Sequence, residues 1–148
     1  NRSVFAHPNL KISAGPAICW EAIFGEFMTG YVSNGADFIA IISNDAWWAN
    51  TPGHKQLLSY TRLRAIELRR DIARSANTGI SSIINAKGEI LLKSEYDTKT
   101  ILKGNITPRS NLTFYVRYGD IIGRWAIFIT GIYFLLAISG RLIEKSKT

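Results

Sequence analysis

The first half of the chain changes its pattern of apolar and polar positions twice. Residues 10–19 form a short apolar run, broken by Gly15 and Pro16, which predicts a strand that ends at the cysteine. Across residues 21–33 the apolar side chains recur every three or four positions, as on one face of a helix. Residues 37–43 are apolar without alternation, which is typical of a strand buried on both faces. The order of strand, sharp turn, helix and strand predicts a βαβ-type unit.

The middle of the chain predicts a loop and then a long helix. Residues 44–51 read NDAWWANT, and Pro52 follows at a position where a helix can begin. Residues 54–76 carry an apolar stripe among many arginines, which predicts one helix with a solvated basic face. Arg64 and Glu67 are three positions apart on this helix, so we expect them to pair. The later predicted elements are two hairpin strands, a further strand and a connector: residues 80–85, 89–94, 98–106 and 108–118.

The last apolar run differs in kind from the others. Residues 121–140 contain one charge, Arg124, and the run has about the 20 apolar residues that a bilayer's hydrocarbon core requires. Tyr115, Tyr118 and Trp125 suit an interfacial aromatic belt, and a short basic tail follows. A buried core helix is the alternative. We therefore predict a globular part, a transmembrane helix and a basic cytoplasmic tail: residues 1–118, 119–141 and 142–148.

Composition and charge narrow the range of partners. With 148 residues, 47% of them hydrophobic, the chain is long and apolar enough for one folded domain and is not a disordered chain. The net charge of +7 favours anionic partners such as phosphate groups. The basic residues are spread along the chain without a nucleic-acid-binding motif, so we expect a membrane partner and no nucleic acid. The cytoplasmic tail would place the globular part on the periplasmic side of a bacterial inner membrane.

Cys19 is the strongest candidate for chemistry. It is the single cysteine, which excludes a disulfide framework and a multi-cysteine metal site, and we expect no metal. A cysteine between a strand and a helix has the geometry of a nucleophile elbow, where the helix N-terminus favours the thiolate. The free N–H groups there, beginning with that of Trp20, can hold an oxyanion. Glu21 and Glu26 add carboxylates on the same helix. On these residues alone, Cys19 is either a nucleophile or a small buried side chain.

The loop after the second strand supplies candidates for substrate binding. Trp47 and Trp48 either line a groove for a substrate or pack on the edge of the sheet. Asn44 and Asp45 directly follow the strand and are secondary candidates, because the active-site rim lies there in the family that the chain resembles, described below. His54 stands at the start of the predicted helix, where we expect a structural or solvated role.

Three sequence runs together resemble a known family. They are ICWEAIFGEF, SNDAWWANTPGHKQ and RLRAIELRRDIARSANTGISSIINAKGEI. Residues 10–140 resemble the C-terminal half of the nitrilase-like domain of the apolipoprotein N-acyltransferase family, including its terminal transmembrane helix. The resemblance implies an α/β fold: the C-terminal half of a nitrilase-like αββα sandwich followed by one transmembrane helix.

The resemblance also implies a Glu-Lys-Cys catalytic triad. Cys19 matches the nucleophile, while the Glu and the Lys would lie upstream of Asn1. On this interpretation the chain is a C-terminal fragment and is inactive alone. Glu21 matches an acidic residue that supports the nucleophile, and Trp20 replaces the tyrosine common at that position.

The implied reaction is acyl transfer without a cofactor. Cys19 would take a fatty acyl chain from a phospholipid as a thioester and pass it to the amino group of a diacylglyceryl-cysteine on an apolipoprotein. A membrane-anchored amidase or nitrilase is the alternative enzyme. A basic membrane-anchored binding module is a third, non-enzymatic hypothesis.

Overall fold

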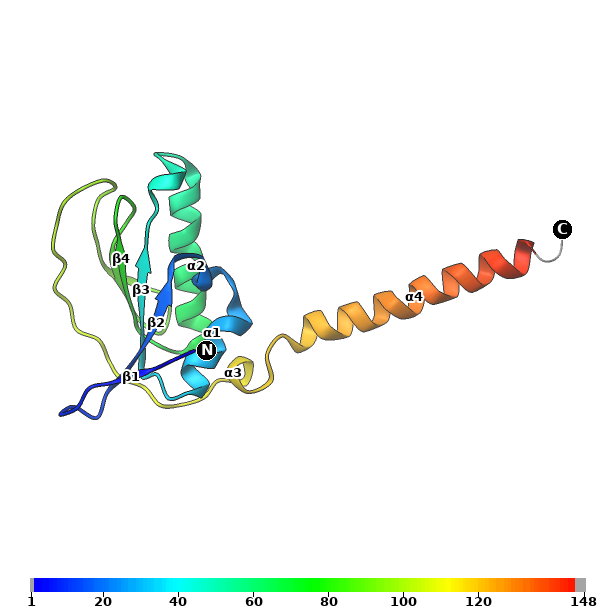
Figure 1. The fold of residues 1–148 in the computed structure, drawn as a ribbon, viewed down its shortest axis with the longest axis horizontal. Coiled ribbons are helices and arrows are strands. Elements are labelled where there is room, and N and C mark those ends of the chain that lie inside the picture. The colour runs from blue at the N-terminus through cyan, green and yellow to red at the C-terminus, as the bar shows by residue number, and fades with distance from the viewer. Residues whose placement is uncertain (1, 146–148) are drawn as a thin grey trace.

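The computed structural model of the protein describes residues 2–145, as a domain built on one sheet and a long helix that projects from it (Figure 1). The sheet has six strands in the order of the chain. Its three middle neighbours, β2, β3 and β4, run parallel, and the outer pairings are antiparallel. The strands are β1 Phe5–Ala6, β2 Ser13–Ile18, β3 Phe38–Ser43, β4 Ile72–Ala76, β5 Ser82–Ile84 and β6 Ile90–Lys93.

Helices cover one face of this sheet. The helical elements are η1 Cys19–Ile23, α1 Gly25–Ser33, η2 Ala46–Trp48, α2 Pro52–Leu68, α3 Phe114–Tyr118 and α4 Ile121–Lys145. Apolar side chains of α1 and α2 pack on the strands, and α2 lies along one side of the sheet in Figure 1. The core includes Ala17, Met28, Val32, Ile39, Ile41, Leu58, Ala65, Leu68, Ile72 and Ile84.

The opposite face of the sheet carries no helix among the described residues. Alternate residues of β3 show the difference, because Ile41 is fully buried and Ile42 is 58% exposed. The described residues therefore cover this strand on one face, and its burial on both faces stays a prediction for the whole sandwich. The connector after β6 crosses part of this open face, where Gly104 lies against Ile83 and Leu92. One sheet with helices on one face is half of the expected four-layer sandwich.

The predicted helix over residues 54–76 is two elements. α2 ends at Leu68, and Arg69 then adopts a left-handed conformation with φ of +51°. The Arg70 side chain is buried and donates hydrogen bonds of 2.8 Å to the carbonyl oxygens of Ala36 and Asn111. Residues after this turn form β4, which pairs with β3 in the centre of the sheet. The turn places Ile72 in β4, where its side chain is completely buried in the core.

Other boundaries confirm or correct the sequence-based predictions. The predicted helix over residues 21–33 begins later, at Gly25, because the 3-10 turn η1 precedes it. The hairpin is confirmed, with Gly88 at φ of +80° in its turn. Residues 98–106 form no strand. The pair of Arg64 and Glu67 is confirmed at 3.2 Å.

The C-terminal helix is long and apolar enough to cross a membrane over Ile121–Ser139, and none of that stretch is buried by the part of the chain that the structure describes. It is the one such helix among the described residues. The described residues therefore do not bury this run as a core helix, and the transmembrane assignment stays a prediction. Helix α4 continues through Lys145, and the last residues of the predicted cytoplasmic tail, 146–148, lie outside the described residues.

Candidate active site

Cys19 lies at the carboxyl end of β2, where the chain turns sharply. Its φ is +50°, a left-handed conformation that a residue with a Cβ seldom adopts. Such strained residues gather at functional sites because the surrounding structure must hold them in place. The side chain is partly exposed. The expected α-helix does not start at the cysteine, since Cys19 is the first residue of the five-residue 3-10 turn η1 and α1 begins only at Gly25.

Glu21 folds back onto this turn. Its Oε2 accepts a hydrogen bond of 2.7 Å from the Ile18 N–H and one of 3.0 Å from the Tyr31 hydroxyl. Burial first, and then the hydrogen bond to Glu21 and its charge, raise the pKa of Tyr31 to about 12. The carboxylate therefore joins the residue before Cys19 to helix α1.

The two adjacent tryptophans point to different surroundings. Trp48 stacks on Trp20, with ring centroids 5.8 Å apart and an interplanar angle of 26°. Gly53 packs directly against the Trp48 indole, leaving no room there for a Cβ. Trp47 is 83% exposed. Trp20 and Trp48 thus form one apolar surface beside Cys19, and Trp47 stands apart from it.

Asn44 and Asp45 also differ in their exposure to solvent. Asn44 is exposed, its Oδ1 accepts from Asn77 at 3.1 Å, and its carbonyl oxygen lies 4.0 Å from the Cys19 sulfur. Asp45 is completely buried and pairs with Arg74 at 2.5 Å. Of these two residues, Asn44 is accessible from outside and Asp45 is enclosed.

The sequence analysis missed two residues beneath the cysteine. Ser43 Oγ lies 3.6 Å from the Cys19 sulfur and 2.5 Å from Asp45 Oδ1. Arg74 was placed on the solvated face of a helix, whereas the structure buries it in β4. The polar Ser43 at the end of an otherwise apolar strand, next to Asn44 and Asp45, was the available signal.

Two other candidate residues, His54 and Glu26, make contacts that fit a structural role. His54 is buried and stacks on Tyr96, with ring centroids 4.4 Å apart. Glu26 turns away from the cysteine to the start of α4, where its Oε1 accepts from the Asp120 N–H and from Arg124, each at 2.8 Å. Arg124 therefore reaches back to the domain.

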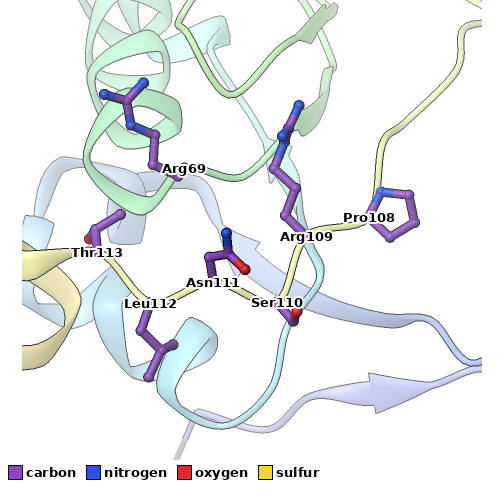
Figure 2. A pocket seen from close by; sticks show the side chains of 7 residues that line it. All are labelled: Arg69, Pro108, Arg109, Ser110, Asn111, Leu112 and Thr113. Carbon is purple, nitrogen blue, oxygen red and sulfur yellow. The ribbon is translucent and has the colours of Figure 1, made fainter.

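A cavity of about 530 Å³ lies elsewhere on the domain (Figure 2). It is lined by Arg69 and by the connector from Pro108 to Thr113. Arg69 follows the C-terminus of α2, while Trp48 packs near its N-terminus. A helix of 17 residues separates these ends by about 25 Å at 1.5 Å per residue. This cavity therefore contains none of the predicted site residues.

The sequence profile of the carbon-nitrogen hydrolase family matches residues 2–111, which hold the whole sheet and the cysteine turn. The chain belongs to the carbon-nitrogen hydrolase family. Within it, the chain is similar to the apolipoprotein N-acyltransferase of Haemophilus influenzae, with 34% identity over 93% of this chain and 26% of that protein. The corresponding protein of Geobacter metallireducens is 38% identical over 76% of this chain and 21% of its own length. The resemblance stated from the sequence is thus confirmed, and the chain spans about a quarter of the length of these relatives.

Solved structures of carbon-nitrogen hydrolases confirm the fold. A mutant of the Nesterenkonia sp. AN1 amidase, from the nitrilase superfamily, superposes with a TM-score of 0.56 at 15% identity, over 84% of this chain and 47% of that one. A carbon-nitrogen hydrolase from Helicobacter pylori gives 0.52 at 17% identity, over 59% of this chain and 37% of its own. The described residues are therefore a portion of a nitrilase-like α/β fold, followed by a long apolar helix.

Proposed function

We propose that this chain is the cysteine-bearing part of a membrane N-acyltransferase. It would transfer a fatty acyl chain from a phospholipid to the N-terminal diacylglyceryl-cysteine of an apolipoprotein. The observation that carries the proposal is the apolar helix α4 beside a carbon-nitrogen hydrolase domain, because the described residues bury none of its stretch Ile121–Ser139. The match to the Haemophilus influenzae N-acyltransferase covers 93% of the chain, so it extends into this helix.

Two half-reactions at the Cys19 sulfur would achieve the transfer. In the first, the deprotonated sulfur attacks the ester carbonyl carbon, the bond from that carbon to the glycerol oxygen breaks, and the lysophospholipid oxygen takes a proton. In the second, the acceptor's amino nitrogen attacks the thioester, the carbon–sulfur bond breaks, and the nitrogen gives a proton back to the sulfur. Neither half-reaction is an oxidation or a reduction, so the proposed chemistry needs no cofactor.

The surroundings of the sulfur suit an acyl chain. Trp20 is half exposed and stacked on Trp48. We assign the Trp20 backbone N–H to the oxyanion, Glu21 to support of the cysteine turn, and Trp48 with Asn44 to substrate contact. Trp47 and Asp45 receive no direct substrate contact because one stands apart and the other is buried.

The experiment supplies an isotopically labelled phospholipid to the protein produced from its own gene in bacterial membranes. The expected result is a hydroxylamine-labile adduct on the peptide that contains Cys19. The adduct should disappear when a diacylglyceryl-cysteine peptide is added, and the label should reappear as an amide on that peptide. Cys19→Ala is the matched control. An active Cys19→Ala protein would contradict the proposal, because alanine offers no nucleophile.

A membrane-anchored amidase is the second candidate. It is favoured by one observation, that the solved structures sharing this fold include an amidase with an adduct at its active-site cysteine. Here water would take the place of the acceptor amine, and a small amide would lose ammonia. Ammonia release from small amides that depends on Cys19, without transfer to a lipopeptide amine, would favour this candidate over the acyltransferase.

A further inference from the structure

A line of buried polar groups runs inward from the Cys19 sulfur. Ser43 Oγ lies 3.6 Å from the sulfur and 2.5 Å from Asp45 Oδ1. The other carboxylate oxygen, Oδ2, accepts from Arg74 at 2.5 Å. Behind it, Arg74 donates to the Thr61 hydroxyl at 3.4 Å. We call Ser43, Asp45, Arg74 and Thr61 the buried polar chain, and none of them is more than 5% exposed.

Stability alone does not explain this arrangement. An ion pair loses its hydration when it is buried, so well-packed apolar residues in its place are often equally stable. Asp45 and Arg74 are nevertheless enclosed on every side, and Gly79 packs so closely on the Asp45 carboxylate that no Cβ fits there. The fold therefore holds a costly ion pair directly beneath the one cysteine of the chain.

The number of hydrogens fixes the direction of each bond. A guanidinium only donates, so Asp45 and Thr61 both accept from Arg74. Thr61 passes its own hydrogen to the Leu57 carbonyl at 2.9 Å. The Ser43 hydroxyl has one hydrogen, and a carboxylate at 2.5 Å accepts it more strongly than a sulfur at 3.6 Å. Ser43 therefore presents a lone pair to Cys19. The thiol S–H then has two acceptors within reach, the Ser43 oxygen at 3.6 Å and the Asn44 carbonyl oxygen at 4.0 Å, and Ser43 is the nearer.

We propose that Ser43, held by the Asp45–Arg74 pair, is a positioning residue that accepts the hydrogen bond of the Cys19 thiol and aims its sulfur. This proposal rests on the proposed function in taking Cys19 as the nucleophile. Ser43 fixes the side-chain direction of Cys19 in the resting protein, and its contact is given up when the thiol proton leaves. Removal of the Ser43 hydroxyl should therefore change two rates in opposite directions. Alkylation of Cys19 should become faster because the thiol hydrogen loses its acceptor, and acyl transfer should become slower because the sulfur is less well oriented.

The test compares Ser43→Ala, Ser43→Thr and Ser82→Ala in the protein produced from its own gene. Ser82 is a matched control, since it is a fully buried serine on the same sheet whose hydroxyl has no hydrogen-bond partner among residues 2–145. One readout is the rate at which iodoacetamide alkylates the Cys19 peptide at pH 7. The other readouts are kcat and KM for acylation by phospholipid, and the melting temperature of each variant.

Ser43→Ala should alkylate several-fold faster, while its kcat falls by about 10- to 100-fold with KM unchanged, the range expected for a misaimed reactive group. Ser43→Thr keeps the hydroxyl and should restore both rates, and Ser82→Ala should change neither. Equal alkylation rates in Ser43→Ala and the unmodified protein would overturn the proposal, as would a fall of both rates together with the melting temperature. If the unmodified protein forms no acyl adduct, the proposed function fails. Faster alkylation of Ser43→Ala would even then support the proposal that Ser43 accepts the hydrogen bond of the Cys19 thiol.

Discussion

At the scale of single residues, Glu21 has two partners that a neutral amide cannot serve equally well. Its Oε2 accepts from both the Ile18 N–H and the Tyr31 hydroxyl. A Glu21→Gln change keeps the shape but removes the charge that makes both bonds strong. Since the turn it holds contains Cys19, we expect thioester formation to slow by about 10- to 1,000-fold, the range typical of lost site electrostatics. An unchanged acylation rate with a slightly lower melting temperature would show that Glu21 only stabilises the turn.

The contact between Tyr31 and Glu21 should also affect how the free energy of unfolding depends on pH. Its pKa is raised from 10.0 to about 12, chiefly by burial and then by Glu21. A raised pKa means that the folded protein holds the phenol proton more tightly than the unfolded chain does. The contribution of Tyr31 to stability is therefore complete below pH 10 and is lost as the pH rises through about 12. The difference in unfolding free energy between the unmodified protein and Tyr31→Phe, measured from pH 8 to 12, should shrink over that window. A constant difference would contradict this assignment.

At the scale of elements, the end of α2 decides where the central strand β4 begins. Arg69 has φ of +51°, a conformation in which a side chain costs about 1–2 kcal/mol and glycine costs little. Arg69→Gly should therefore raise the free energy of unfolding, by up to about 1 kcal/mol after the added flexibility of the unfolded chain is subtracted. If the helix continued through this position, the same change would instead lower it by about 1 kcal/mol relative to alanine. Denaturation of Arg69→Gly and Arg69→Ala side by side gives the sign.

The missed boundary at Arg69 shows what the sequence pattern contains and what it lacks. Strands β2 and β3, the hairpin and α4 were predicted because each depends on its own run of apolar residues or on a local turn. The end of α2 has no glycine or proline, and Ile72 continues the apolar spacing of the helix, so the local pattern predicts one long helix. Strand β4 forms because β3 is available to pair with it, which is information from a distant part of the chain.

In the candidate site, too, contacts between sequence neighbours could be predicted and a contact between distant segments could not. Cys19, Trp20 and Glu21 are consecutive, so their proximity could be predicted from the sequence together with the turn that holds them. The pairing of Asp45 with Arg74 joins the loop after β3 to strand β4 across 29 positions, and the sequence pattern could not predict it. Without that pairing, Asp45 resembled a rim residue and Ser43 an ordinary end of a strand.

The carboxylate of Glu26 connects the domain to the start of α4. Glu26 accepts from the Asp120 N–H and from Arg124, and these contacts, with the Asp120 hydrogen bond largest, lower the pKa of Glu26. A lowered carboxyl pKa stabilises the junction above the ordinary value of 4.5, and the effect is lost as the pH falls through the folded value. Both side chains are largely exposed, so global stability should change little.

The expected effect of Glu26→Gln is therefore local. Cleavage of the segment between α3 and α4 by a protease should become several-fold faster at pH 7, because the first turn of α4 loses its anchor on α1. Arg124→Lys keeps the charge and should remain close to the unmodified protein. Equal cleavage rates for the unmodified protein and Glu26→Gln would show that the exposed pair does not hold the junction.

At the scale of the whole molecule, the orientation of α4 decides which side of the membrane the cysteine faces. Arg141, Lys145 and Lys147 follow the apolar run closely, and Lys and Arg next to a transmembrane helix favour the cytoplasmic side. The domain before α4 is basic as well, but large translocated domains do not follow the charge rule. We therefore expect the domain and Cys19 on the periplasmic side of a bacterial inner membrane. Alkaline phosphatase fused after Thr148 should be inactive, and a fluorescent protein that matures only in the cytoplasm should be bright at the same position. Active phosphatase at this position would reverse the orientation and place Cys19 on the cytoplasmic side.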